Sequence, residues 1–283
     1  MSIYVELALL PFQLPFMQYA FLITAMIAVP MAMLSCFLVL KGWSLMGDAV
    51  SHAVLPGVVL AYMLSLPLGL GAFLAGLVCA LATGYVKENS RIKEDTVLGI
   101  IFSGMFGLGL VMFVAVKSDV HLDHILFGDM LGIAPRDLIE TGLMALACVL
   151  FLGILRKDLL LHAFDPQHAQ AIGLAVKLLH YGLLTALSLT VVAALTAVGI
   201  ILSVAFLVAP GAIAFLLTRQ FHAMMLVAIG VALGCSLVGI WLSFLIDSAP
   251  APTIVLMMTA VFVVAFVRET WLSSRRRVAE TLR

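Results

Sequence analysis

The chain has 283 residues, of which 64% are hydrophobic and only 11% are charged, and its formal net charge at pH 7 is zero. A soluble domain is roughly 45–50% apolar and about 25% charged, so this composition excludes an ordinary soluble protein and indicates a chain that crosses a membrane several times. The zero net charge also argues against a nucleic-acid partner. The four cysteines lie far apart in apolar runs, which indicates neither a disulfide framework nor a thiolate metal site: Cys36, Cys79, Cys148 and Cys235.

Apolar segments long enough to cross a hydrocarbon core about 30 Å thick follow one another along the chain. They lie at 17–40, 48–66, 68–86, 96–116, 138–155, 178–197, 199–217, 223–246 and 252–270. We expect eight or nine spans, because the joins at 65–69 and 197–199 are short enough to be breaks within one helix. The sequence therefore predicts an all-α polytopic membrane protein, with residues 1–283 forming a single transmembrane domain.

Basic residues indicate the orientation of these spans. With nine crossings, the basic groups fall on alternate connections, which the positive-inside rule places in the cytoplasm: Lys41, 87–93, Arg156 and Lys157 with Lys177, Arg219, and 268–277. The opposite side keeps Lys117 and Arg136, diluted by acidic residues. We expect the amino terminus outside the cytoplasm, with no removable signal peptide.

One acidic residue and one histidine stand out in the second apolar segment. Between Lys41 and Lys87 the only charged residue is Asp48 and the only histidine is His52. A lone aspartate costs roughly 2.5–3.5 kcal/mol to insert into a bilayer and needs a compensating partner. At positions i and i+4 of a helix the two side chains share a face, and a carboxylate beside an imidazole suits a divalent first-row metal. The alternative is a polar pair that joins two helices. The neighbouring Gly47 and the Pro56–Gly57 pair are expected to let the backbone bend there.

A second set of potential ligands lies in the connection between 117 and 137 on the opposite side. It holds His121, Asp123 and His124, which have a spacing compatible with a metal site. A solvated loop, or one that docks a partner, has the same composition.

The longest cytoplasmic connection, about 156–177, predicts a short helix. Asp165 and Pro166 form a helix start, with aspartate as the N-cap and proline at the first helical position, and Gly173 is a plausible stop. Two helical turns are not stable alone in water. The segment therefore needs a surface to lie on, from either its own domain or a partner protein.

Four segments together resemble the membrane permeases of ATP-binding cassette importers for manganese, iron and zinc. They are LVLKGWSLMGDAVSHAVLPGVVLAY (38–62), LFGDML (126–131), FDPQHAQAIGL (164–174) and VGIILSVAFLVAPGAIAFLLT (198–218). The chain is most similar to the permeases of manganese and chelated-iron systems, and the likeness covers nearly its whole length.

The resemblance implies a type II importer-like permease in the bacterial inner (plasma) membrane. Such permeases pair with a second chain, identical or similar, and the transport path lies between the two. Asp48 and His52 of each chain would then bind the transported ion, with manganese, iron(II) and zinc as the expected cargoes and no tightly bound cofactor. The 164–174 segment would be the coupling helix, and its matching positions are Phe164, Asp165, Pro166, Ala169, Ile172 and Gly173.

The same resemblance implies cytoplasmic ATP-binding subunits and an extracellular or periplasmic metal-binding protein as partners, besides membrane lipid. The chain contains no Gly–Lys dipeptide and hence no phosphate-binding loop of the G-x-x-x-x-G-K-[ST] type, so a separate subunit must bind ATP. A stand-alone secondary transporter or channel for divalent ions is the alternative function.

An enzyme is not expected. No His-Glu-x-x-His helix is present, and Ser51 and His52, adjacent on a helix, point about 100° apart.

Overall fold

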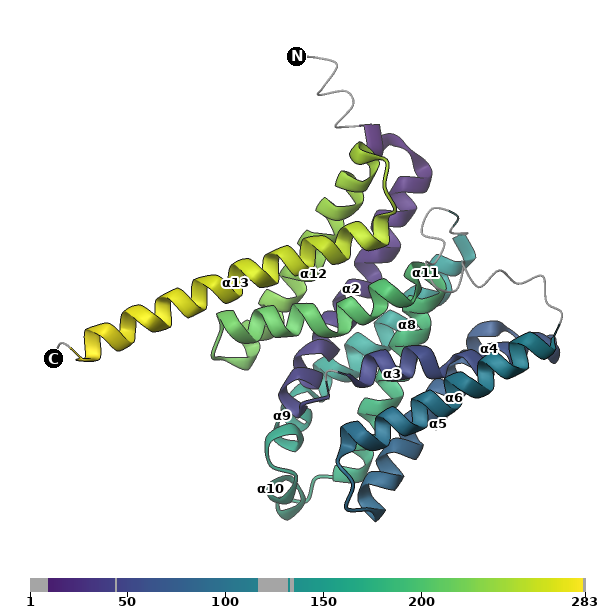
Figure 1. The fold of residues 1–283 in the computed structure, drawn as a ribbon, viewed down its shortest axis with the longest axis horizontal. Coiled ribbons are helices and arrows are strands. Elements are labelled where there is room, and N and C mark those ends of the chain that lie inside the picture. The colour runs from purple at the N-terminus through teal and green to yellow at the C-terminus, as the bar shows by residue number, and fades with distance from the viewer. Residues whose placement is uncertain (1–9, 44, 117–131, 133–134, 282–283) are drawn as a thin grey trace.

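The computed structural model describes residues 10–43, 45–116, 132 and 135–281 (Figure 1). Within these ranges the ordered elements are helices, and they confirm the predicted all-α fold. In chain order they are α2 (Pro15–Lys41), α3 (Met46–Ala53), α4 (Leu55–Met63), α5 (Leu68–Asn89), α6 (Glu94–Ala115), α8 (Pro135–Ile154), α9 (Arg156–Phe164), α10 (Pro166–Ala171), α11 (Val176–Leu217), α12 (Phe221–Ile246) and α13 (Pro250–Thr281).

The described residues contain 9 stretches that are long and apolar enough to cross a membrane, which decides between the eight and nine spans expected. The join after α4 is a turn in which Ser65 takes a positive φ of 53°. The other join lies inside α11, whose 42 residues would form a rod about 63 Å long, twice the hydrocarbon thickness. Gly199 interrupts its helical path with φ 79° and ψ 175°, so α11 supplies two spans.

Helix α2 lies at the centre of the molecule, where α8, α11 and α12 pack against it. It approaches α11 closely at Gly211, since a Cβ there would lie 2.5 Å from the Ser35 hydroxyl. That hydroxyl accepts the N–H of Gly211 at 2.9 Å and donates to the carbonyl of Val208 at 3.3 Å. The Ser35 side chain of α2 thus forms hydrogen bonds with the Val208 carbonyl and the Gly211 N–H, which lie on either side of Pro210. Proline interrupts the backbone hydrogen bonding of the helix at this point.

Two groups of helices flank this centre. Figure 1 shows α4, α5 and α6 together on one side, and α12 with α13 on the other. Helices α4 and α5 touch backbone to backbone, because a Cβ on Gly57 would overlap the carbonyl oxygen of Gly71, and the reverse also holds. Close contact between small residues is how helices associate in lipid, where apolar burial gives little driving force.

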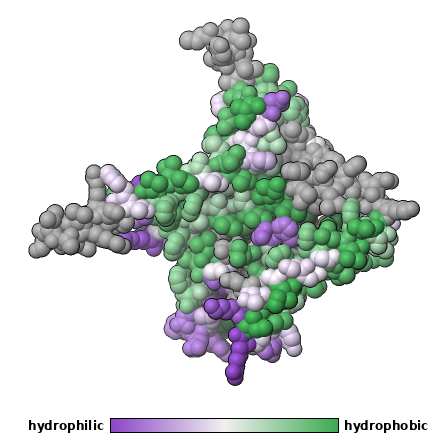
Figure 2. Space-filling view, viewed as in Figure 1, coloured by the Kyte–Doolittle hydropathy of each residue, from purple (hydrophilic) through white to green (hydrophobic). Residues whose placement is uncertain are grey.

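The connection between α8 and α11 contains the predicted short helix and one more. Asp165 caps α10, because its Oδ1 accepts the backbone N–H of His168 at 2.9 Å. Gly173 follows with φ 88°, a left-handed conformation that favours glycine at a helix stop. The sequence analysis did not anticipate α9, which buries Leu159 and His162 against its own chain. Figure 2 shows hydrophilic residues gathered at the end of the molecule where Figure 1 places α9 and α10.

Candidate functional site

Helix α3, which carries the Asp48–His52 pair, lies beside the middle of three other spans. A Cβ on Gly47 would come within 2.6 Å of the Leu207 side chain in α11, and a Cβ on Gly76 of α5 would lie 3.2 Å from Val50. The ring of His52 lies 5.6 Å from that of Phe106, near the middle of α6. Since these contacts fall well inside the spans at 197–217, 68–87 and 96–115, the pair lies deep within the membrane domain.

The span that contains α3 is broken at its centre. Helices α3 and α4 meet at Val54, and Pro56 is the second residue of α4. Proline has no backbone N–H, so the helical hydrogen bond to the carbonyl four residues earlier, that of His52, cannot form. Helix α6 fits against the break, because a Cβ on Gly109 would lie 2.8 Å from the backbone nitrogen of Pro56.

Gly47 and Gly57, which the sequence suggested would let the backbone bend, have a packing role instead. Gly47 and Gly57 both lie within helices and allow close packing, Gly47 against α11 and Gly57 against α5. The break itself coincides with Pro56. The interruption is limited to the hydrogen bonding at Pro56, because Val54 keeps a right-handed helical backbone between α3 and α4.

Asp48 and His52 are adjacent on one face of α3, as their spacing predicted. The Nδ1 atom of His52 lies 3.0 Å from the backbone carbonyl oxygen of Asp48 and 3.3 Å from its carboxylate Oδ1. Both neighbours are acceptors, so the neutral ring carries its proton on Nδ1 and keeps a lone pair on Nε2. Metal-binding histidines commonly have this arrangement, with one nitrogen fixed by a carbonyl or carboxylate and the other left for the metal.

Both side chains remain accessible in the single chain. The side chain of His52 is 30% exposed and that of Asp48 is 41% exposed, although they lie beside mid-span residues. Phe102 and Phe106 lie near the imidazole on the α6 side. The hydroxyl of Ser51 donates to the backbone carbonyl of Gly47 at 2.8 Å, within α3. The hydroxyl proton is therefore directed at the backbone and not at His52.

One chain does not complete a metal site within the part of the sequence that the structure describes. No group of three or more His, Cys, Asp or Glu side chains there is arranged to hold a metal ion. Asp48 and His52 are two side chains of ligand type, whereas divalent first-row metals take at least four ligands. The predicted ligands His121, Asp123 and His124 lie outside the described residues.

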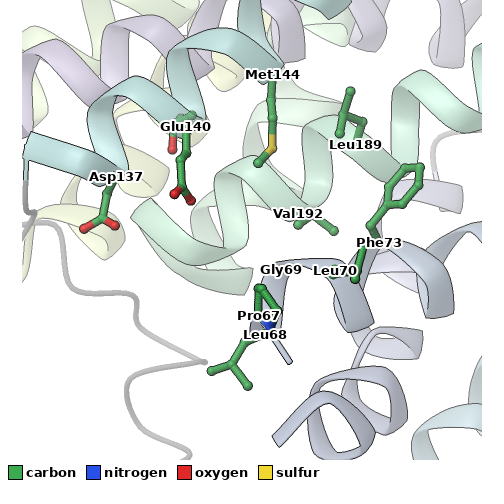
Figure 3. A pocket seen from close by; sticks show the side chains of 11 residues that line it. Pro67, Leu68, Gly69, Leu70, Phe73, Asp137, Glu140, Met144, Leu189 and Val192 are labelled. Carbon is green, nitrogen blue, oxygen red and sulfur yellow. The ribbon is translucent and has the colours of Figure 1, made fainter. Parts of the chain in front are cut away.

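A second concave feature with acidic residues lies between α5, α8 and α11. This pocket of about 410 Å³ is shown in Figure 3, with Asp137 and Glu140 extending from α8 and Phe73 from α5. Most of its remaining lining is apolar. By the predicted orientation it opens on the outer side of the membrane.

The predicted coupling residues surround α10 but differ in exposure. Phe164 is 67% exposed and Ile172 is 56% exposed, although both are large and apolar. Ala169 is fully buried and can act in coupling only by holding α10 on its own chain. Asp165, Pro166 and Gly173 form the start and the end of the short helix. Phe164 and Ile172 are thus an exposed apolar pair at the two ends of the capped, anchored helix α10, Phe164 at the end of α9 and Ile172 directly after α10.

Comparison with known proteins gives consistent matches over nearly the whole chain. The model of the ABC 3 transport family matches residues 13–269. The chelated iron transport system membrane protein YfeD of Yersinia pestis is 55% identical over 257 residues, which are 91% of this chain and 86% of YfeD. The manganese transport system membrane protein MntB of Synechocystis is 46% identical over 91% of this chain and 84% of its own. Among solved structures, a chain of PsaBC from Streptococcus pneumoniae in complex with Fab matches with a TM-score of 0.82 and 35% identity, covering 94% of this chain and 95% of that one.

Proposed function

Because the chain belongs to the ABC 3 transport family, it is the membrane subunit of a bacterial ATP-binding cassette uptake system for iron or manganese, and we propose that Asp48 and His52 bind the ion in transit. The subunit spans the membrane and is not itself the ATPase. Its cargo is a substrate rather than a resident cofactor, and zinc remains a second possible cargo because oxygen and nitrogen ligands also suit zinc.

The observation that carries this proposal is the contact of the His52 Nδ1 atom with the carbonyl and carboxylate oxygens of Asp48. Because Asp48 holds Nδ1, the His52 Nε2 and the Asp48 carboxylate are two ligands of the right type on a broken helix at mid-span. An exposed carboxylate at this depth costs several kcal/mol without a counter-charge. A divalent cation passing through the path supplies that charge.

A second permease chain, identical or similar, completes the ligand set. Two chains that face each other through α3 would place two carboxylates and two imidazoles around one ion. The two negative charges then balance the 2+ charge of the cargo in a region of low dielectric constant. The two ligands that one chain supplies in its described part support this arrangement.

The exposed pair Phe164 and Ile172 is the proposed contact for a cytoplasmic ATP-binding subunit. Two large apolar side chains beside a capped helix of 6 residues form a small protruding surface. ATP-driven movement of that surface would reach the transport path through α9 and α11, which both contact α10. On the outer side, an extracellular or periplasmic metal-binding protein delivers the ion.

The test replaces Phe164 and Ile172 together with aspartate in cells that lack other importers for iron and manganese. We expect uptake of radiolabelled manganese to fall to background and the ATPase subunit to stop co-purifying. Gln220→Asp is the control for added negative charge: it adds one aspartate, against two in the double variant, to another cytoplasmic connection where aspartate is a favourable N-cap. Normal uptake by the double variant would instead indicate a stand-alone carrier.

A further inference from the structure

A pocket of about 390 Å³ lies among the ends of α2, α5, α9, α10 and α11, separate from the Asp48–His52 pair. Its lining contains three lysines and two histidines around one tryptophan: Lys41, Lys87, Lys177, His162, His180 and Trp43. Among the described residues that line it, none is acidic. The pocket is therefore a concave, positively charged surface.

The aromatic ring of Trp43 organises the basic side chains. The Nζ of Lys41 lies 4.4 Å from the centre of that ring and the Nζ of Lys87 lies 5.7 Å from it. The indole is only 6% exposed, and the ring of His180 packs edge-on at 5.4 Å. The ammonium groups of Lys41 in α2 and Lys87 in α5 thus both lie near the same buried indole ring.

His162 adds a buried polar group to the same lining. Its side chain is only 4% exposed, and its Nε2 lies 3.0 Å from the Lys41 ammonium. Burial, followed by the charge of Lys41 and the neighbouring His180, lowers the pKa of His162 to about 4. The ring is therefore neutral at pH 7, and its Nε2 accepts a hydrogen bond from the Lys41 ammonium. The proton of the ring then lies on Nδ1, which is a hydrogen-bond donor. That donor has no hydrogen-bond partner among the described residues.

The depth of the pocket distinguishes the anions that can reach it. Lys41 ends the span at 15–41, Lys87 ends the span at 68–87, and Lys177 follows the first residue of the span at 176–195. All three lie where the hydrocarbon core gives way to the headgroup layer, a depth that buried tryptophan also favours. A phosphate at this level belongs to a lipid headgroup, and basic pockets between helix ends on the cytoplasmic side bind such headgroups.

We propose that this pocket binds the phosphodiester headgroup of an anionic glycerophospholipid from the cytoplasmic leaflet. Lys41, Lys87 and Lys177 pair with the phosphate, and His162 lies beneath them. Pro166, the first residue of α10, and Ala163 of α9 also line the pocket. The bound headgroup therefore contacts the start of the short helix α10, which Phe164 and Ile172 flank.

The experiment compares the full-length wild-type chain with Lys87→Gln/Lys177→Gln, two changes at exposed side chains. Both proteins are reconstituted in nanodiscs of phosphatidylethanolamine with phosphatidylglycerol, and retained lipid is counted by native mass spectrometry. We expect the double variant to bind phosphatidylglycerol about 25-fold more weakly, a factor of about five for each lysine near the membrane surface. Arg268→Gln serves as control, because Arg268 lies in the terminal span at 250–272 and does not line the pocket.

Equal retention of phosphatidylglycerol by the wild type and the double variant would overturn the proposal. So would a loss of about fivefold in Arg268→Gln, because the effect would then follow the number of positive charges removed rather than the pocket. A second arm adds inorganic phosphate to nanodiscs that lack phosphatidylglycerol. Phosphate binding there, without any preference for phosphatidylglycerol in the first arm, would assign the pocket to a free anion and refute the lipid assignment.

Discussion

Replacing Asp48 with asparagine removes one negative charge from the proposed ion path and leaves the shape of the side chain almost unchanged. The amide can still lie beside His52, so α3 keeps its local packing and the Nδ1 atom of His52 keeps its 3.0 Å partner, the backbone carbonyl. What changes is the interaction with the cation. We therefore expect an inserted, assembled protein that no longer transports.

The expected magnitude follows from the burial of the site. Removing one partner from a buried ion pair costs about 3–5 kcal/mol. The Asp48 side chain is 41% exposed in the single chain, so solvent screens part of its charge and the lower end of that range applies. A loss of about 3 kcal/mol weakens ion binding more than a hundredfold.

The assay is uptake of radiolabelled manganese at a concentration near the wild-type half-saturation point, with membrane insertion measured by immunoblot. Asp247→Asn is the matched control. Asp247 is exposed and caps α12 with a positive φ of 51°, a conformation that asparagine also tolerates. Wild-type uptake by Asp48→Asn, or an equal defect in both variants, would show that the charge of Asp48 is not needed for ion binding.

Three further predictions follow from the packing and the charges. The folded chain keeps His162 neutral down to about pH 4, whereas an unfolded histidine takes up its proton near pH 6.5. Stability therefore falls as the pH drops through that window, and His162→Gln should reduce the loss at about pH 5 by about 2 kcal/mol in thermal unfolding. Asp165→Ala removes the cap of α10 at a cost of about 1 kcal/mol, so uptake should fall about fivefold without loss of insertion. An unchanged uptake rate would contradict a role of the capped helix α10 in transport. Gly57→Ala forces α4 away from α5 and should lower stability by at least about 1–3 kcal/mol, whereas Gly104→Ala, with open space around it, should be tolerated in the same unfolding assay.

Local patterns predicted the spans and the short cytoplasmic helix. Hydrophobic length alone placed the spans within a few residues of their observed bounds, because each must cross a core of fixed thickness. The helix start at Asp165–Pro166 and the helix stop at Gly173 are each set by residues next to one another in the sequence. The structure confirms the helix that they predicted. The adjacency of Asp48 and His52 likewise follows from helical spacing.

Contacts between distant segments could not be predicted in this way. Lys41 and His162 meet although 121 residues separate them, and no local pattern links the two. The packing of Gly109 against Pro56 depends on where α6 crosses the break between α3 and α4. The described residues of one chain contain no group of three or more His, Cys, Asp or Glu side chains that could hold a metal ion, so the proposed ligand pair can be completed only by groups that the pattern of this sequence does not reveal.

The most direct test of the account is an anomalous difference map of the assembled transporter soaked with manganese. We predict a peak within coordination distance of the Asp48 carboxylate and the His52 Nε2, with further ligands from the second permease chain. A peak elsewhere in the membrane domain, with the Asp48 carboxylate turned toward lipid or held by a protein cation, would contradict the proposed ion path.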